Sequence, residues 1–256
     1  MDAELLVKVE NKIATLTINR EKKQNSLSEE VLDLLSCSLD EFENSSKVRV
    51  IVITGAGEKA FCSGADISGF KNPKDIAKVN KKFARLLTRL TTYPKATLSR
   101  VNGLCMGGGI GLMLACDISL SHHACIFCTP EVNIGVFPLM ISSLIFENVK
   151  SKKIANDMIL SGRRISGVQA YEYGLLSQIY PSDDFESEVE KYITELSKKS
   201  SQIISFGKSS MAKVAGLPFD QAVIELSGAL SEMITLEDAK EGVRAFMEKR
   251  PPNFKH

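Results

Sequence analysis

Residues 101–111 read Val-Asn-Gly-Leu-Cys-Met-Gly-Gly-Gly-Ile-Gly. The three consecutive glycines, Gly107 to Gly109, follow an apolar stretch typical of a strand and precede one typical of a helix. Such a turn exposes backbone N–H groups at the N-terminal end of a helix, where the helix dipole favours negative charge. The stretch therefore indicates a strand–turn–helix unit whose main chain can stabilise an anion.

Two known uses of glycine-rich turns fit this stretch poorly. A phosphate-binding loop needs a lysine followed by serine or threonine, and no such pair follows Gly109. A dinucleotide-binding loop needs a third glycine at the position that Leu112 occupies. Stabilising a transient oxyanion needs only N–H donors, so this use remains open.

A second glycine-containing loop lies earlier in the chain, where residues 60–67 read Ala-Phe-Cys-Ser-Gly-Ala-Asp-Ile. It follows the continuous apolar run of residues 48–54, which is typical of a buried strand. An oxyanion hole is usually built from two donors on different segments, and this loop can supply the second one. Taken alone, each loop is better explained as a tight turn.

Strands and helices alternate through most of the remaining sequence. Short apolar runs predict strands at residues 5–9, 13–18, 48–54, 96–101, 117–121, around 126, and 175–180. Helical spacing predicts helices at residues 26–44, 78–90, 109–115, 138–147, 152–160 and 166–174, with capping boxes at Ser26–Glu29 and Ser166–Gln169. From residue 184 onward the pattern is helical only. We therefore expect an α/β core over residues 1–195 and a helical region over residues 196–256.

Composition and charge narrow the class of protein. The chain of 256 residues has a net charge of +1, 44% apolar residues and 25% charged residues, which is ordinary for a globular protein. This charge gives no reason to expect nucleic acid as a partner. No run approaches the roughly 18 apolar residues of a membrane span. The sequence starts with Met-Asp-Ala-Glu, which lacks the basic residues of a signal peptide, so we expect a cytoplasmic protein that does not bind membranes.

The cysteines and histidines suggest neither a metal site nor a hydrolase triad. The segment from His122 to Cys128 contains a C-x-x-C, but no second ligand pair occurs at a matching spacing. On a strand, Cys125 and Cys128 point to opposite faces, so we expect six reduced cysteines and no metal. The chain has three histidines and no G-x-S-x-G, which argues against a serine nucleophile.

Taken together, these motifs resemble the crotonase (enoyl-CoA hydratase/isomerase) superfamily over essentially the whole chain. The two glycine loops at residues 61–67 and 101–109 carry the main resemblance. Further matching motifs are Asn19-Arg20, Asn25-Ser26-Leu27, Cys116-Asp117-Ile118, Thr129-Pro130-Glu131, residues 160–166 and residues 241–254. The resemblance implies a spiral of ββα units with C-terminal helices that form trimers or dimers of trimers.

The resemblance also implies roles for individual residues. The N–H groups of Ala65 and Gly108 would form the oxyanion hole around the thioester C=O of an acyl-CoA. Glu131 would be the acid–base residue. Binding of the substrate or its CoA part would involve Lys22, Lys23, Ser63, Ala65, Asp66, Ile67, Gly107 and Phe137. Apart from the coenzyme A of the substrate itself, no cofactor is expected.

One departure from the family pattern bears on the reaction. Hydratases of this superfamily typically carry a second glutamate soon after the triple glycine, and Gly111 occupies that position here. The family's glycine-rich stretch after the Pro-Glu motif is also replaced, by residues 136–142. Adding water most simply needs two positioned acid–base groups, whereas moving a double bond between C3 and C2 needs only one. We therefore favour Δ3,Δ2-enoyl-CoA isomerisation.

Two alternatives remain, namely an enoyl-CoA hydratase with its second acid elsewhere and a degenerate acyl-CoA-binding protein that has lost its chemistry. For the isomerase, we expect Met106, Phe137, Leu139 and Met140 to surround Glu131. Such apolar neighbours would desolvate the carboxylate, which raises its pKa and makes it a stronger base. We also expect that replacing Gly111 by glutamate raises hydration if Ile110 and Leu112 hold the helix in the family's register.

Overall fold

Ten strands and ten α-helices are assigned in the part of the chain that the structure describes. The structure is a computed structural model that describes residues 3–66 and 73–256. The strands are β1 (Leu5–Glu10), β2 (Ile13–Ile18), β3 (Val50–Gly55), β4 (Ala60–Cys62), β5 (Ala96–Val101), β6 (Leu104–Met106), β7 (Ile118–His122), β8 (Ile126–Cys128), β9 (Ile165–Ser166) and β10 (Gln178–Tyr180). The helices are α1 (Glu29–Glu43), α2 (Pro73–Thr91), α3 (Gly108–Leu114), α4 (Leu139–Asn148), α5 (Lys152–Ser161), α6 (Gly167–Tyr173), α7 (Phe185–Ser197), α8 (Ser201–Val214), α9 (Phe219–Met233) and α10 (Glu237–Met247), with 3-10 turns η1 (Glu21–Lys23) and η3 (Pro130–Ile134).

The strands form two sheets that the chain visits in turn. One sheet has the order β1-β2-β3-β5-β7-β10, and the other has the order β4-β6-β8-β9. Strands β3, β5 and β7 each lead into a short partner, β4, β6 or β8, in the second sheet, and a helix or 3-10 turn follows. The strands of successive units pair in parallel, both in the long sheet and in the short one. This arrangement is the ββα spiral that the sequence predicts.

The central strands are covered on both faces, as their continuous apolar runs require. Every residue of β3 is buried. One face of the sheet contributes to the main core, in which α1, α2, α3, α4 and α5 also take part. On the other face a smaller cluster joins Val50, Val52 and Leu98 to Phe185 and Val189 of α7. The long strands therefore form a rigid base for the short sheet and its loops.

The structure confirms one of the two predicted capping boxes. Ser166 and Gln169 form the predicted capping box at the start of α6. The prediction for α1 was wrong, because its N-cap is Ser28, which accepts from the N–H of Val31. The Ser26 hydroxyl instead accepts from Arg20, and Leu27 is still paired with the loop around Ala65. The chain is therefore held extended through Leu27, and the helix can begin only after it.

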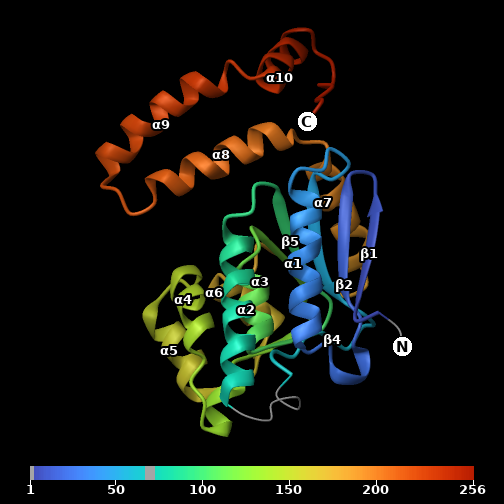
Figure 1. The fold of residues 1–256 in the computed structure, drawn as a ribbon, viewed down its shortest axis with the longest axis vertical. Coiled ribbons are helices and arrows are strands. Elements are labelled where there is room, and N and C mark those ends of the chain that lie inside the picture. Colours follow the sequence, from blue (N-terminus) through green and yellow to red (C-terminus); the bar gives the residue numbers. More distant parts are fainter. Residues whose placement is uncertain (1–2, 67–72) are drawn as a thin grey trace.

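The three last helices lie together at one end of the molecule, at the top of Figure 1, in orange to red. The carboxylate of Asp238 is buried and accepts from the Ser200 hydroxyl and from the backbone N–H groups of Lys255 and His256. Several large apolar side chains of this region are exposed, namely Met211, Leu217, Phe219, Val223, Ile224, Leu230, Ile234, Val243, Phe246 and Met247. Among the described residues, no helix is long and apolar enough to cross a membrane.

Candidate active site

The candidate site lies at the carboxyl ends of three adjacent parallel strands. In the short sheet, Cys62 of β4 pairs with Cys105 of β6, and Met106 pairs with Cys128 of β8. In the chain, Ala65 comes soon after β4, Gly108 soon after β6 and Glu131 soon after β8. Because parallel strands end at the same edge of a sheet, the register brings the three predicted site residues together.

Two backbone N–H groups lie close together beside this edge. The Gly64 carbonyl accepts from the Leu27 N–H at 2.8 Å, and the Asp66 N–H donates to the Leu27 carbonyl at 3.0 Å, which leaves the Ala65 N–H unused between them. Gly108 is the first residue of α3, so its N–H has no partner within the helix. A Cβ built on Gly108 would lie 3.6 Å from the Ala65 nitrogen. Within residues 3–66 and 73–256, neither N–H has a hydrogen-bond acceptor, so both can donate to an oxyanion.

Glycine is needed at two positions of this edge. Gly64 has a φ of +92°, and a Cβ there would lie 3.0 Å from the Gly108 nitrogen. Gly107 has a φ of +51°, and a Cβ there would lie 2.7 Å from Glu131 Oε1. Both backbones are in the left-handed region that other residues rarely adopt. The glycines thus allow the two loops and the carboxylate to approach one another closely.

Glu131 lies in η3 and presents a desolvated carboxyl group to this space. Its Oε2 is buried and accepts no hydrogen bond from any of the described residues. Burial raises the pKa of the Glu131 carboxyl above its ordinary value, although a hydrogen bond from its own backbone N–H acts in the opposite direction. A carboxylate with an unpaired oxygen and a raised pKa is suited to take up a proton.

The raised pKa predicts the pH dependence of the reaction. The ionised carboxylate is the base, so kcat/KM should fall as the pH is lowered through the raised pKa of Glu131. We expect the midpoint of this acid limb above the ordinary glutamate value of 4.5. Kinetics on both sides of this value would test it, and a midpoint at or below 4.5 would show that Glu131 is not the titrating base.

The surroundings of Gly111 are apolar and closely packed. A Cβ built on Gly111 would lie less than 3.0 Å from Cγ2 of Ile141, a separation that real Cβ atoms essentially never show, and 3.4 Å from Cζ of Phe83. Both side chains are buried, with exposed fractions of 3% and 7%. Glutamate at position 111 therefore fits only if the Ile141 side chain moves, a condition that the expected gain in hydration did not include.

The predicted apolar lining of Glu131 also needs correction. Phe137, Leu139 and Met140 are exposed, and Met106 is half-buried. The carboxyl is instead buried against the Gly107 turn. The reason is that the loop between η3 and α4 points outward, which side-chain hydrophobicity alone could not indicate. A substrate-binding role for Phe137 stays a prediction.

The residues predicted to bind CoA lie around the loop of Ala65. Lys22 and Lys23 are exposed on η1, and the Ser63 N–H donates to the Gln24 carbonyl at 3.1 Å, which holds η1 against this loop. The Asp66 carboxylate forms an ion pair with Arg20 at 2.6 Å. Ile67 lies outside the described residues. The basic residues are thus on a segment that is bonded to the loop of Ala65, and their contact with CoA remains a prediction.

Some site residues were missed by sequence reasoning. Phe83 of α2 and Ile141 of α4 form the wall beside Gly111, although each looks like an ordinary core residue on its own helix. The signal that could have revealed Ile141 was the unusual stretch of residues 136–142 that ends beside it. Arg20 lies within the quoted Asn19-Arg20 motif, but its ion pair with Asp66 was not foreseen.

The cysteine and histidine segment shows no sign of a metal centre. All six cysteines are free, and five of them are buried. Burial raises the pKa of the Cys125 and Cys128 thiols, which disfavours the thiolate that binds metal. Within the part of the chain that the structure describes, no group of three His, Cys, Asp or Glu residues could hold a metal ion.

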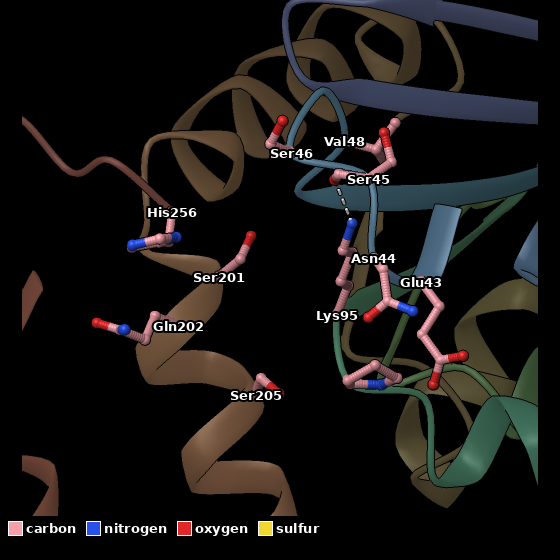
Figure 2. Close-up of a pocket in the computed structure, with 11 residues that line it drawn as sticks. Glu43, Asn44, Ser45, Ser46, Val48, Lys95, Ser201, Gln202, Ser205 and His256 are labelled. Carbon is pink, nitrogen blue, oxygen red and sulfur yellow. Dashed lines mark hydrogen bonds between the residues drawn. The ribbon is translucent and has the colours of Figure 1, made fainter. Parts of the chain in front are cut away.

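A separate cavity of about 270 Å³ lies between the end of α1 and the start of α8, away from Glu131 (Figure 2). Lys95 is buried there and donates to the carbonyls of Phe42 and Ser45, the latter at 2.6 Å. Burial lowers the pKa of Lys95, against the effect of the Glu43 charge. These bonds satisfy carbonyl groups at and just after the end of α1, so we interpret Lys95 as a structural cap.

Comparisons with known proteins agree with the geometry. The family model described as enoyl-CoA hydratase/isomerase matches residues 8–256. A putative enoyl-CoA hydratase of Thermus thermophilus is 32% identical over 94% of this chain and 97% of its own length. A short-chain-enoyl-CoA hydratase of Clostridium acetobutylicum is 28% identical, with 96% and 95% covered. The crystal structure of an enoyl-CoA hydratase from Bacillus anthracis aligns with a TM-score of 0.92 and 26% identity, covering 98% of this chain and 99% of that one.

Proposed function

Because the chain belongs to the enoyl-CoA hydratase/isomerase family, we propose that it moves the double bond of a 3-enoyl-CoA to C2, with Glu131 as the only acid–base residue. The observation that carries this proposal is the environment of the two candidate acid positions. Glu131 is a desolvated carboxylate close to the N–H groups of Ala65 and Gly108. The position of the second family acid is instead a glycine packed against the side chains of Ile141 and Phe83. A single proton carrier favours isomerisation over hydration.

The proposed steps use the backbone N–H groups of Ala65 and Gly108 and the carboxylate of Glu131. The thioester oxygen accepts hydrogen bonds from the N–H groups of Ala65 and Gly108. The Glu131 carboxylate removes a proton from C2, and the electron pair moves onto the thioester oxygen to give a dienolate. Glu131 then returns the proton to C4, which leaves the double bond between C2 and C3. No water or external reductant is consumed.

Hydration of a 2-enoyl-CoA is the second candidate function. The relatives named above are called hydratases, and this favours the addition of water. For water to add, its oxygen must bond to C3, a proton must reach C2, and a general base must activate the water. In this chain Glu131 would have to perform both proton transfers. We therefore place hydration second, and a non-catalytic acyl-CoA-binding protein third.

Direct comparison of the two reactions decides between these candidates. We expect the purified chain to convert a 3-enoyl-CoA into its 2-enoyl isomer faster than it hydrates a 2-enoyl-CoA of the same length. Chromatography with mass detection separates isomerisation, which keeps the mass, from hydration, which adds one water. Hydration that outruns isomerisation would overturn the proposal, and the absence of both reactions despite CoA binding would favour a binding protein.

We further propose that residues 1–195 hold the site and that residues 196–256 mediate assembly into a homotrimer or a dimer of trimers. The support is the set of exposed apolar side chains on α8, α9 and α10 given above. Such side chains on a single chain are typical of a surface that a partner covers. The molar mass of the chain in solution, measured by light scattering, tests this assignment.

A further inference from the structure

Two departures from the family pattern meet in space at Ile141. One is Gly111 on α3, and the other is the stretch of residues 136–142, which leads into α4 and contains Ile141. Cγ2 of Ile141 would lie less than 3.0 Å from a Cβ built on Gly111. A side chain at position 111 and Cγ2 of Ile141 therefore compete for one volume.

Position 111 is close to Gly108, whose N–H is one of the two proposed oxyanion donors. Gly108 and Gly111 are three positions apart on α3 and share one face of the helix. Cζ of Phe83 would lie 3.5 Å from a Cβ on Gly108 and 3.4 Å from a Cβ on Gly111, so one ring spans both positions. The Glu131 carboxyl lies on the other side, beside Gly107. A substrate bound at the hole would thus have a carboxylate on one side and a hydrocarbon wall of Phe83 and Ile141 on the other.

We propose that Ile141 determines the reaction specificity of this enzyme by filling the place in which a second acid and its water would stand. This inference rests on the proposed isomerase function and deepens it. The Ile141 side chain is 3% exposed and carries no polar atom, so it offers a water molecule no hydrogen bond. With no water held at C3, the 2-enoyl product does not add water, and only the proton transfers by Glu131 remain. A glycine at position 111 is then what Ile141 favours, since any larger residue would require Ile141 to move.

Substitutions at positions 111 and 141 together test this inference. Ile141→Val keeps Cγ2, whereas Ile141→Ala removes it and leaves Cβ, which would lie 3.4 Å from a new Cβ at position 111. We expect Gly111→Glu combined with Ile141→Ala to raise hydration of a 2-enoyl-CoA at least about tenfold over Ile141→Ala alone, since one general acid–base group typically contributes 10²–10⁴-fold. Gly111→Glu in the wild-type or Ile141→Val background should give no such gain.

Gly111→Gln in the Ile141→Ala background is the matched control, because glutamine has the shape of glutamate and cannot transfer the proton. The inference is overturned if Gly111→Glu raises hydration as much with Ile141 present as without it. It is also overturned if the folded Gly111→Glu, Ile141→Ala variant hydrates no faster than its glutamine control.

A second measurement covers the case in which the glutamate variants do not fold. Thermal unfolding of Gly111→Ala, Ile141→Ala and the double variant gives the coupling between the two positions. We expect Gly111→Ala to lower the unfolding temperature in the wild type and to lower it less in the Ile141→Ala background. Additive shifts would show that the two side chains do not compete. The coupling measured by unfolding does not depend on which reaction the wild type catalyses. A failure of the isomerase proposal is recognised separately, by comparing the rates on 3-enoyl-CoA and 2-enoyl-CoA.

Discussion

Replacing Glu131 by glutamine is expected to reduce turnover about 10²–10⁴-fold while the fold and CoA binding are retained. The amide has the size of the carboxyl but neither removes nor returns a proton. Its effect on stability should be opposite to its effect on activity. Because burial raises the pKa of Glu131, the ionised group destabilises the folded chain once the pH is above that raised value. Glu131→Gln should therefore unfold at the same or a higher temperature at neutral pH.

The measurement is the isomerisation rate of the variant together with its affinity for CoA and its thermal unfolding. Glu147→Gln is the matched control, because Glu147 is exposed on α4 and its replacement makes the same change of charge. We expect this control to behave like the wild type. If Glu131→Gln keeps wild-type turnover, Glu131 is not the proton carrier and the proposed function fails with it.

Replacing Gly108 by alanine is expected to lower turnover by up to about 10²–10³-fold, the loss typical of one missing oxyanion donor. The N–H group remains, but the methyl group would keep the thioester oxygen away from it. The added methyl group would lie 3.6 Å from the Ala65 nitrogen, in the space that the thioester oxygen must enter. Its other contacts, to Cα of Gly64 and Cζ of Phe83, would be 3.5 Å long, which is ordinary van der Waals contact. Gly108 does not have a positive φ, so alanine is also compatible with its backbone.

This substitution separates the role of the N–H group from that of the fold. Gly207→Ala is a suitable control, because Gly207 lies on α8 and a Cβ there would have no neighbour within 4 Å. We expect the control to keep its activity and both variants to unfold near the wild-type temperature. Full turnover by a folded Gly108→Ala variant would show that the thioester oxygen does not bind at this N–H.

The sequence predicts most of the elements because their patterns are local. The strand at residues 13–18 is recovered with the predicted bounds, since it alternates between apolar and polar residues. β6 was missed because three residues after a glycine are too short for any period to show. The start of α2 was placed at residue 78 instead of Pro73, although proline is well suited to the first turn of a helix.

The candidate site also has a part that the sequence predicts and a part that it does not. Ala65, Gly108 and Glu131 follow strands whose order in the chain is their order in the sheet, so motifs along the sequence point to neighbours in space. The contact of Ile141 with Gly111 joins two helices through side-chain packing. No periodicity in either helix specifies which face meets the other, so this contact appears only in the folded chain.

The order of the short strands has a consequence for how the protein acquires its activity during folding. β4, β6 and β8 belong to three successive turns of the spiral, and each turn supplies one of the three groups that would act on the substrate. An intermediate that has formed two of these turns would already bury much apolar surface, yet it would lack either a donor or the proton carrier. Pairing such distant segments is slow compared with forming a helix. Recovery of enzymatic activity should therefore follow the recovery of helical structure when the chain refolds.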